Sequence, residues 1–258
     1  RKRVAEAWIV DLKLSAMPGW PSAVDAFVHE RLAAYEEAYL ARGYAHPELV
    51  GMDMEQFTKI APFDPDMFTT APPHVTFVVR RDRLWYAGGF AKFLHRAVRK
   101  LGLGKVLGGL FTACQERSVK RTMRLLRRAR PGITFTIVGL GPKRTADADV
   151  EDLRTEQMDL SVERAWCHAY ARSQVVVGVH GSNMLLPTAL AGGCVEILPY
   201  ERYGNLAQDV AVRHADRLQL FLYRFVDEFA PPKAVARNVS SMFRDFAHFK
   251  RGMKTNTF

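Results

Sequence analysis

The chain has 258 residues, of which 48% are hydrophobic and 25% charged, as is typical of a soluble globular protein. No stretch approaches the roughly 20 consecutive apolar residues of a membrane-spanning helix, which excludes that class. The three cysteines, Cys114, Cys167 and Cys194, are odd in number and far apart, so they fit neither a disulfide framework nor a zinc site. We therefore expect a protein of the reducing cytoplasm.

The net charge of +10 is concentrated in one segment. Residues 80–130 contain 15 Lys and Arg against only Asp82 and Glu116, a local charge of +13, whereas the rest of the chain carries −3. Such a segment favours phosphates, nucleic acid or an anionic membrane surface as partners. It contains no recognised nucleic-acid motif and no aromatic residues interleaved with the basic run, so we expect no nucleic-acid partner.

The first 73 residues are predicted to be mainly helical. Apolar residues recur at helical spacing over 22–43, and Gly43 is a suitable helix end. The stretch APFDPDMFTTAPP, residues 61–73, is rich in proline and is predicted to be a linker.

A different pattern begins at His74. We expect strands at 75–79, 133–141, 175–179 and 194–199, with a weaker candidate near 152–160. Helices are predicted over 115–132, over 161–173 with Ser161 as N-cap, around Pro187, and over 220–229 and 240–249. Alternation of strands and helices predicts an α/β fold, a doubly wound parallel sheet of Rossmann-like type.

Three parts follow from this pattern. Residues 1–73 form an N-terminal, mainly helical segment, residues 74–210 a Rossmann-like domain, and residues 211–258 C-terminal helices that pack back on the domains. In such a domain, ligands bind beyond the carboxyl ends of the strands.

The residues His180, Gly181, Ser182 and Asn183 lie at such a strand end, where a helix begins. Backbone N–H groups at a helix start attract anions, and a glycine lets the backbone approach a ligand closely. Arg80, Arg83 and Lys143 follow two other strands, so the sequence predicts a diphosphate site at this edge. The alternative is a glycine turn with a structural histidine and no ligand.

These residues also carry a family resemblance. The stretches VTFVVRRDRLW (75–85) and VVVGVHGSNMLLPTALAGGCVEILPYERYGN (175–205) resemble the nucleotide-binding half of glycosyltransferase family 61 in its bacterial form. The resemblance spans roughly residues 74–210. The matching positions are Arg80, Arg83, His180, Gly181, Asn183, Glu196, Pro199 and Asn205.

The resemblance implies a two-domain GT-B architecture and transfer of a sugar, with inversion, from a nucleotide-sugar donor to a glycan or lipid-linked glycan. The expected donor is UDP-linked, and no metal or other cofactor is expected. Residues 1–73 are shorter and more helical than the full acceptor domain of that family, so this part is either reduced or incomplete. The implied location is the cytoplasm, with contact at the inner face of the membrane.

Sugar transfer assigns roles to the candidate residues. Arg80, Arg83, Lys143 and the Gly181–Asn183 turn, with Ser182, would meet the diphosphate charge, and Asp82 would orient the arginines. Glu196 would bind ribose hydroxyls, or else pair with a buried arginine or a helix-end N–H, and Asn205 would contribute to the donor site. Inversion requires a general base, and His180 is the candidate, although it is equally suited to donate to a phosphate.

Other interpretations stay open at this stage. A polysaccharide pyruvyl transferase would bind phosphoenolpyruvate, and a non-catalytic domain would act as a scaffold. The D-x-D pairs Asp64/Asp66 and Asp147/Asp149 lie in loops, so we interpret them as solvated turns. The basic stretches 90–110 and 117–130 fit an amphipathic surface on an anionic membrane or a solvated face packed on the sheet.

Overall fold

The computed structural model describes residues 22–37, 53–86, 88–145, 147–208, 213 and 216–254. Its contacts divide the chain into two units, Arg1–Gly43 and Tyr44–Phe258. In the first unit, helix α1 spans Ser22–Leu32. The helix predicted to reach Gly43 therefore ends earlier, because residues 33–37 form turns and bends; residues 38–43 lie outside the described part.

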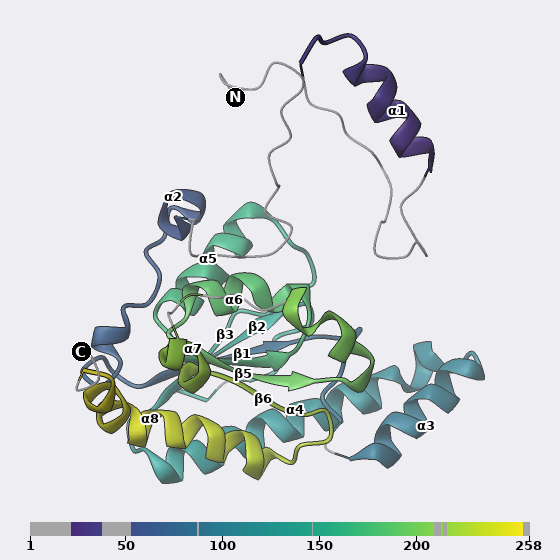
Figure 1. Ribbon diagram of the computed structural model, residues 1–258. Coiled ribbons are helices and arrows are strands. Elements are labelled where there is room, and N and C mark those ends of the chain that lie inside the picture. Colours follow the sequence, from purple (N-terminus) through teal and green to yellow (C-terminus); the bar gives the residue numbers. More distant parts are fainter. Residues whose placement is uncertain are drawn as a thin grey trace. The chain divides into compact units, whose positions relative to one another are not determined.

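The second unit is built on a six-stranded, all-parallel sheet with strand order β3-β2-β1-β4-β5-β6 (Figure 1). The strands are β1 (His74–Val79), β2 (Thr134–Gly139), β3 (Val150–Asp152), β4 (Val175–Val179), β5 (Gly193–Leu198) and β6 (Tyr223–Asp227). This is a Rossmann-like α/β fold, as the sequence predicts. The described residues contain a single sheet, so the second domain of a GT-B architecture is not among them.

Helices cover both faces of the sheet. The helices of this unit are α2 (Met54–Thr58), α3 (Gly89–Lys100), α4 (Gly104–Ala129), α5 (Leu160–Ala171), α6 (Leu185–Leu190), α7 (Asp216–Leu222) and α8 (Pro232–Lys254), with short 3₁₀ helices η3 (Pro65–Met67), η4 (Ser182–Met184) and η5 (Tyr200–Gln208). Helices α4 and α8 lie on one face, and α5 and α6 on the other (Figure 1). None of the helices in the described ranges combines the length and apolar character that crossing a bilayer requires.

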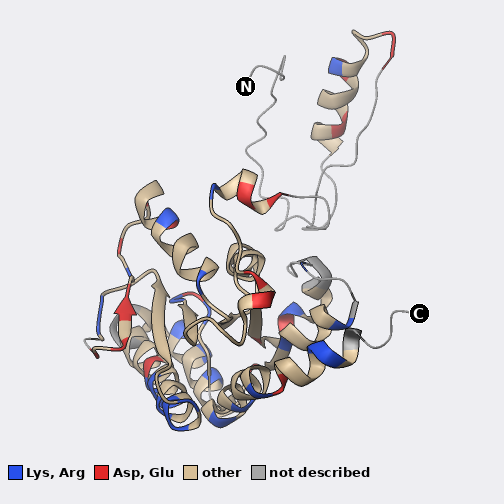
Figure 2. Ribbon diagram, turned by 90° about the vertical axis from the view of Figure 1, so that its left-hand side faces the viewer, with Lys and Arg blue, Asp and Glu red and all other residues tan. Residues whose placement is uncertain are grey.

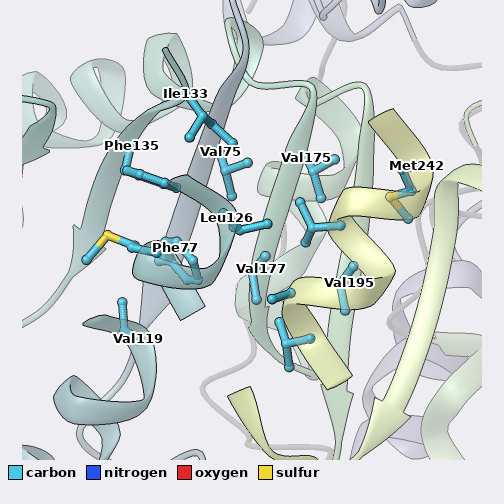
Figure 3. Packing of buried hydrophobic residues seen from close by; sticks show 14 of the residues in the cluster. Val75, Phe77, Val119, Leu126, Ile133, Phe135, Val175, Val177, Val195 and Met242 are labelled. Carbon is cyan, nitrogen blue, oxygen red and sulfur yellow. The ribbon is translucent and has the colours of Figure 1, made fainter. Parts of the chain in front are cut away.

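Side chains of the strands pack into two hydrophobic cores, one on each face of the sheet, because successive side chains of a strand point to opposite sides. Val75 and Phe77 of β1 pack with Leu126 of α4 and with α8 in the larger cluster. Figure 3 shows Val119 and Leu126 of α4 and Met242 of α8 against the strand side chains. Val78, one position on from Phe77, joins Tyr170 of α5 in the cluster on the opposite face.

The structure corrects several local predictions. The stretch 61–73 is not a linker, because Phe63 and Phe68 are buried in the larger core. The N-cap of α5 is Asp159, whose side chain accepts from the N–H of Val162, and Ser161 lies inside the helix. The weak strand is β3, which ends at Asp152, before most of its predicted range.

The largest correction concerns the last strand. Residues 220–229 are predicted to be helical, but α7 ends at Leu222 and β6 begins at Tyr223. Strand β6 pairs with β5 alone and lies at the edge of the sheet. Its residues are half-buried or exposed, which gives an edge strand a mixed polar and apolar sequence that resembles an amphipathic helix.

Candidate functional site

The topology creates a switch point between β1 and β4. These central strands lie side by side, but the chain continues from β1 to β2 and β3 on one side, and from β4 to β5 and β6 on the other. The connections after β1 and β4 therefore diverge and leave a crevice at their carboxyl ends, where open α/β sheets bind ligands. Arg80 directly follows β1, and His180–Asn183 directly follow β4.

Arg80 is held in place from both sides of the crevice. Its Nε donates to Asp82 Oδ1 at 2.7 Å, its Nη2 donates to Asp82 Oδ2, and its Nη1 donates to Asn183 Oδ1. The hydrogen bond from Arg80 is the main reason that the pKa of Asp82 lies below its ordinary value. Asp82, which is predicted to orient the arginines, is thus hydrogen-bonded to Arg80. Since guanidinium has five N–H donors, these contacts leave two for a ligand.

Asn183 offers a further donor. Its Oδ1 accepts from Arg80, so its Nδ2 is the free end of the amide. This nitrogen is buried and has no hydrogen-bond partner in the described part of the chain. Because an unpaired buried donor is costly, a ligand oxygen is a suitable partner for it.

Arg83 lies against the turn that Gly181 makes. Arg83 Nη1 donates to the carbonyl of His180 at 3.4 Å. Gly181 has a φ of +146°, and a Cβ there would lie 2.2 Å from Arg83 Nη1. In this arrangement the glycine leaves room for an arginine of the same chain.

His180 and Glu196 form a buried pair beneath this turn. Both side chains are 0% exposed, and His180 Nδ1 is hydrogen-bonded to Glu196 Oε2. The hydroxyl of Tyr223 donates to Glu196 Oε1 at 2.6 Å, and burial raises the pKa of Tyr223, which keeps this phenol neutral. His180 Nε2 is buried without a partner among the described residues. Glu196 is thus held by His180 and Tyr223, where the sequence suggests an arginine or a helix-end N–H as its buried partner.

A cavity of about 740 Å³ opens beside Arg80, between the strand ends and helices α5 and α6. Polar groups of Arg80, Ser182 and Asn183 line one part, and the apolar wall includes Met158, Trp166 and Leu186. The indole of Trp166 is fixed by its Nε1, which donates to the carbonyl of Leu153 at 2.9 Å. The lining of the cavity thus combines apolar side chains with hydrogen-bond donors.

Three carboxylates also line this cavity, those of Asp82, Glu156 and Glu163. Asp82 is bonded to Arg80, and both Glu156 oxygens accept from Arg81, at 3.0 and 3.1 Å. Glu163, on α5, forms no ion pair with another described residue. Of the three carboxylates, Glu163 is therefore the one left for a group of a ligand to contact.

The predicted site residues are thus only partly brought together. Arg80, Ser182 and Asn183 line the cavity; Lys143 is exposed outside its lining, and the side chain of Asn205 lies outside the described part. Sequence reasoning missed Glu163 and Trp166 as site residues. Trp166 has the spacing of the apolar stripe of its helix, so its sequence position indicates burial and not a ligand.

The D-x-D pairs are occupied by contacts within the chain. Asp64 Oδ1 accepts from the N–H of Asp66 at 2.8 Å in the turn of η3. Asp147 and Asp149 are not simply solvated, because both accept from the guanidinium of Arg127. Within the described ranges, no group of three or more His, Cys, Asp or Glu side chains is arranged to hold a metal ion.

Comparisons of the chain with protein-family models, with curated proteins and with solved structures find no significant match.

Proposed function

We propose that this chain is a glycosyltransferase that binds a nucleotide-linked sugar in the cavity beside Arg80. The observation that carries the proposal is the guanidinium of Arg80, fixed by Asp82 and Asn183 at the switch point of the sheet. A guanidinium oriented in this way, with donors left over, is suited to a diphosphate. The sequence resemblance to glycosyltransferase family 61 supports the same substrate class.

The cavity suits the remaining parts of such a donor. Its volume of about 740 Å³ falls in the range of small-molecule sites, which are mostly apolar with a few placed polar groups. We place the base against Trp166 and Met158, and the diphosphate near Arg80, Ser182 and Asn183. UDP is the expected nucleotide, and the acceptor is a glycan or a lipid-linked glycan.

The chemistry requires stabilisation of negative charge on the leaving diphosphate. Arg80 and the amide of Asn183 supply fixed donors, each contributing about 3 kcal/mol of transition-state stabilisation if it is comparable to an oxyanion-hole donor. The buried pair of His180 and Glu196 anchors the turn that presents Asn183. This gives both residues a positioning role.

We assign the general base to Glu163 in place of His180. A base must reach the acceptor hydroxyl, and His180 is fully buried, whereas Glu163 lines the cavity and has no ion pair in the described part of the chain. Asp82 and Glu156 are less suitable, because each is hydrogen-bonded to an arginine.

The proposal is tested by isothermal titration of the chain with UDP, GDP, CDP and, separately, phosphoenolpyruvate. Arg80→Ala and Asn183→Ala are the site variants. Arg244→Ala is the matched control, because Arg244 is also paired with a nearby aspartate, Asp245, but lies on α8. Circular dichroism verifies the fold of each variant.

We expect one nucleotide to bind with micromolar affinity and both site variants to lose at least about tenfold in affinity, since each loses a donor to a charged group. Arg244→Ala should bind like the wild type. Binding of phosphoenolpyruvate alone would instead favour pyruvyl transfer. A folded protein that binds none of these ligands would contradict the proposal.

A further inference from the structure

Helix α3 presents an apolar face away from the body of the protein. Phe90 is 78% exposed, Phe93 67% and Leu101, just after the helix, 72%. Leu94 is 39% exposed, and Leu103 and Leu110, at and after the start of α4, are 45% and 53% exposed. We call these six residues the α3–α4 apolar patch. A monomeric soluble protein seldom groups so many large apolar side chains on its surface without a partner for them.

A different face of α3 anchors the helix. Val98 is buried in a small core with Leu84 and Phe111. Lys92 is bonded to Glu201 at 2.9 Å and to Glu228, and its side chain is only 12% exposed. The predicted stripe of Phe90, Leu94 and Val98 is therefore divided, because Val98 points inward and the other two point outward. The exposure of the patch follows from how α3 is held.

Cations flank the patch, and acidic residues are absent from this part of the chain. Arg96 and Lys100 of α3 are exposed, and Arg117 and Arg121 are exposed further along α4. No Asp or Glu occurs in the sequence between Asp82 and Glu116. Figure 2 shows Lys and Arg gathered along the helix layer below the sheet. Exposed cations beside an apolar centre are complementary to an anionic bilayer.

A second cavity adjoins the same helices. It has a volume of about 480 Å³, and its lining includes one carboxylate and three guanidinium groups, those of Asp82, Arg81, Arg99 and Arg144, together with Gly104, Gly108 and Gly109 of α4. Arg81 and Arg144 have carboxylate partners, Glu156 at 3.0 Å and Glu116 at 3.4 Å. Arg99 forms no ion pair with another described residue, so it adds positive charge beside the patch that is suited to a phosphate headgroup.

We infer that the α3–α4 apolar patch docks the protein on the surface of an anionic lipid bilayer. Phe90, Phe93 and Leu101 enter the boundary between headgroups and acyl chains, while Arg96 and Lys100 contact lipid phosphates. The helix is about 18 Å long and lies in the plane of the interface. This inference does not depend on the proposed function, because it concerns a different surface and a different ligand.

Co-sedimentation with vesicles tests the inference on the full chain. One set of vesicles contains phosphatidylcholine and phosphatidylglycerol in equal parts, and the other phosphatidylcholine alone. We expect the wild type to bind the anionic vesicles more tightly, and binding to weaken as salt is raised. The double variant Phe90→Glu/Phe93→Glu should lower the partition coefficient at least about tenfold, since it removes two large apolar groups from the contact.

Two further variants sharpen the test. Phe57→Glu is the matched control, because Phe57 is 69% exposed but lies on α2, and it should bind like the wild type. Arg96→Glu/Lys100→Glu should abolish the preference for anionic vesicles. In addition, Phe93→Trp should give a blue shift of fluorescence on vesicle addition beyond that of the wild type, which reports entry of the side chain into the apolar layer.

Several results would overturn the inference. The first is a wild type that stays in the supernatant with anionic vesicles, and the second is a Phe90→Glu/Phe93→Glu variant that sediments as the wild type does. Sedimentation velocity without lipid provides another: a wild-type dimer that becomes a monomer in this variant would assign the patch to a second copy of the chain. Binding to single-stranded RNA without binding to anionic vesicles would show that the basic residues around the patch bind nucleic acid and not lipid.

Discussion

Tyr223 donates a hydrogen bond of 2.6 Å to Glu196, and this contact ties the edge strand β6 to its neighbour β5. The other oxygen of Glu196 is bonded to His180, at the end of β4. Three consecutive strands of the sheet are thus linked by buried polar side chains beneath the turn that carries Asn183. The position of Asn183, at the switch point, therefore depends on the edge strand β6.

Tyr223→Phe should destabilise the protein by about 1–3 kcal/mol, because it removes a hydrogen bond of 2.6 Å to a fully buried carboxylate. Urea denaturation followed by circular dichroism measures the change. Tyr170→Phe is the control, since Tyr170 is also buried but its hydroxyl forms no hydrogen bond with a described residue. Equal losses for the two variants would contradict the importance of this contact.

Gly139→Ala should be more disruptive than most glycine substitutions. Gly139 ends β2 with a φ of +134°, and a Cβ there would lie 2.1 Å from the carbonyl oxygen of Val79 on β1. Backbone of the central strand would have to move, so we expect a loss of about 3 kcal/mol or failure to fold.

Gly132→Ala separates the strain of a positive φ from the clash with Val79, the two causes of the loss expected for Gly139→Ala. Gly132 has a φ of +79°, but a Cβ there would meet nothing within 4 Å. It should therefore cost only the conformational strain, about 1 kcal/mol. The same denaturation experiment compares the two variants, and similar losses would show that the contact with Val79 is unimportant.

His74 should make stability depend on pH. Burial, with a smaller effect of Arg172, lowers the pKa of His74 from 6.5 to about 4. Between these values the unfolded chain binds a proton that folded His74 does not. The free energy of unfolding should therefore be highest above pH 6.5 and fall by up to about 3 kcal/mol as the pH decreases to 4.

His74→Gln tests this dependence, because it removes the titrating group. Its free energy of unfolding should change less between pH 6.5 and 4 than that of the wild type, although the hydrogen bonds to Thr134 and Thr136 are altered. His168→Gln replaces an exposed histidine and should retain the wild-type slope. An unchanged slope in His74→Gln would rule out His74 as its source.

Much of the sheet is predictable from sequence because its central strands are buried on both faces. Runs such as Val175–Val179 are continuous and apolar, as strands buried on both faces of a parallel sheet are expected to be. The pattern fails for β6, where Tyr223–Asp227 faces solvent in part and mixes polar with apolar residues. The prediction also fails for residues 61–73, because the many prolines of this stretch indicate a linker, whereas two of its phenylalanines are buried in the core.

The site is less predictable, because sequence gives the position of a residue but not the direction of its side chain. Arg80 and Asn183 follow adjacent strands, so strand ends alone place them together. His180 directly follows β4, and Glu196 lies on the neighbouring strand β5. Their side chains, however, point into the protein and pair there. Glu163 enters the cavity from a helix, and only the packing of α5 on the sheet reveals it.

Asp82→Asn should weaken binding of the nucleotide that the titrations identify. If Asp82 orients Arg80, its loss frees the guanidinium, and we expect about a tenfold increase in Kd, as for loss of one charge-assisted contact. If Asp82 only opposed the diphosphate through its negative charge, the same substitution would tighten binding. The sign of the change therefore distinguishes the two roles. Asp245→Asn, in the Arg244–Asp245 pair, should leave Kd unchanged.

Glu163→Gln should lower kcat by about 10²- to 10⁴-fold if Glu163 is the general base, while leaving nucleotide affinity unchanged. The amide keeps the size of the side chain but cannot accept the proton of the acceptor hydroxyl. Release of nucleotide diphosphate from UDP-sugars, in the presence of a panel of glycan acceptors, measures the rate. Glu156→Gln is the control, because Glu156 lines the same cavity but is paired with Arg81.

His180→Ala completes this comparison. As a buried positioning residue it should reduce stability and nucleotide affinity together, because the turn bearing Asn183 loses its anchor. A general base would behave differently, since kcat would fall while binding and stability stayed close to those of the wild type. If His180→Ala shows that second pattern and Glu163→Gln retains full activity, the base is His180, and the side chain must leave its buried position during the reaction.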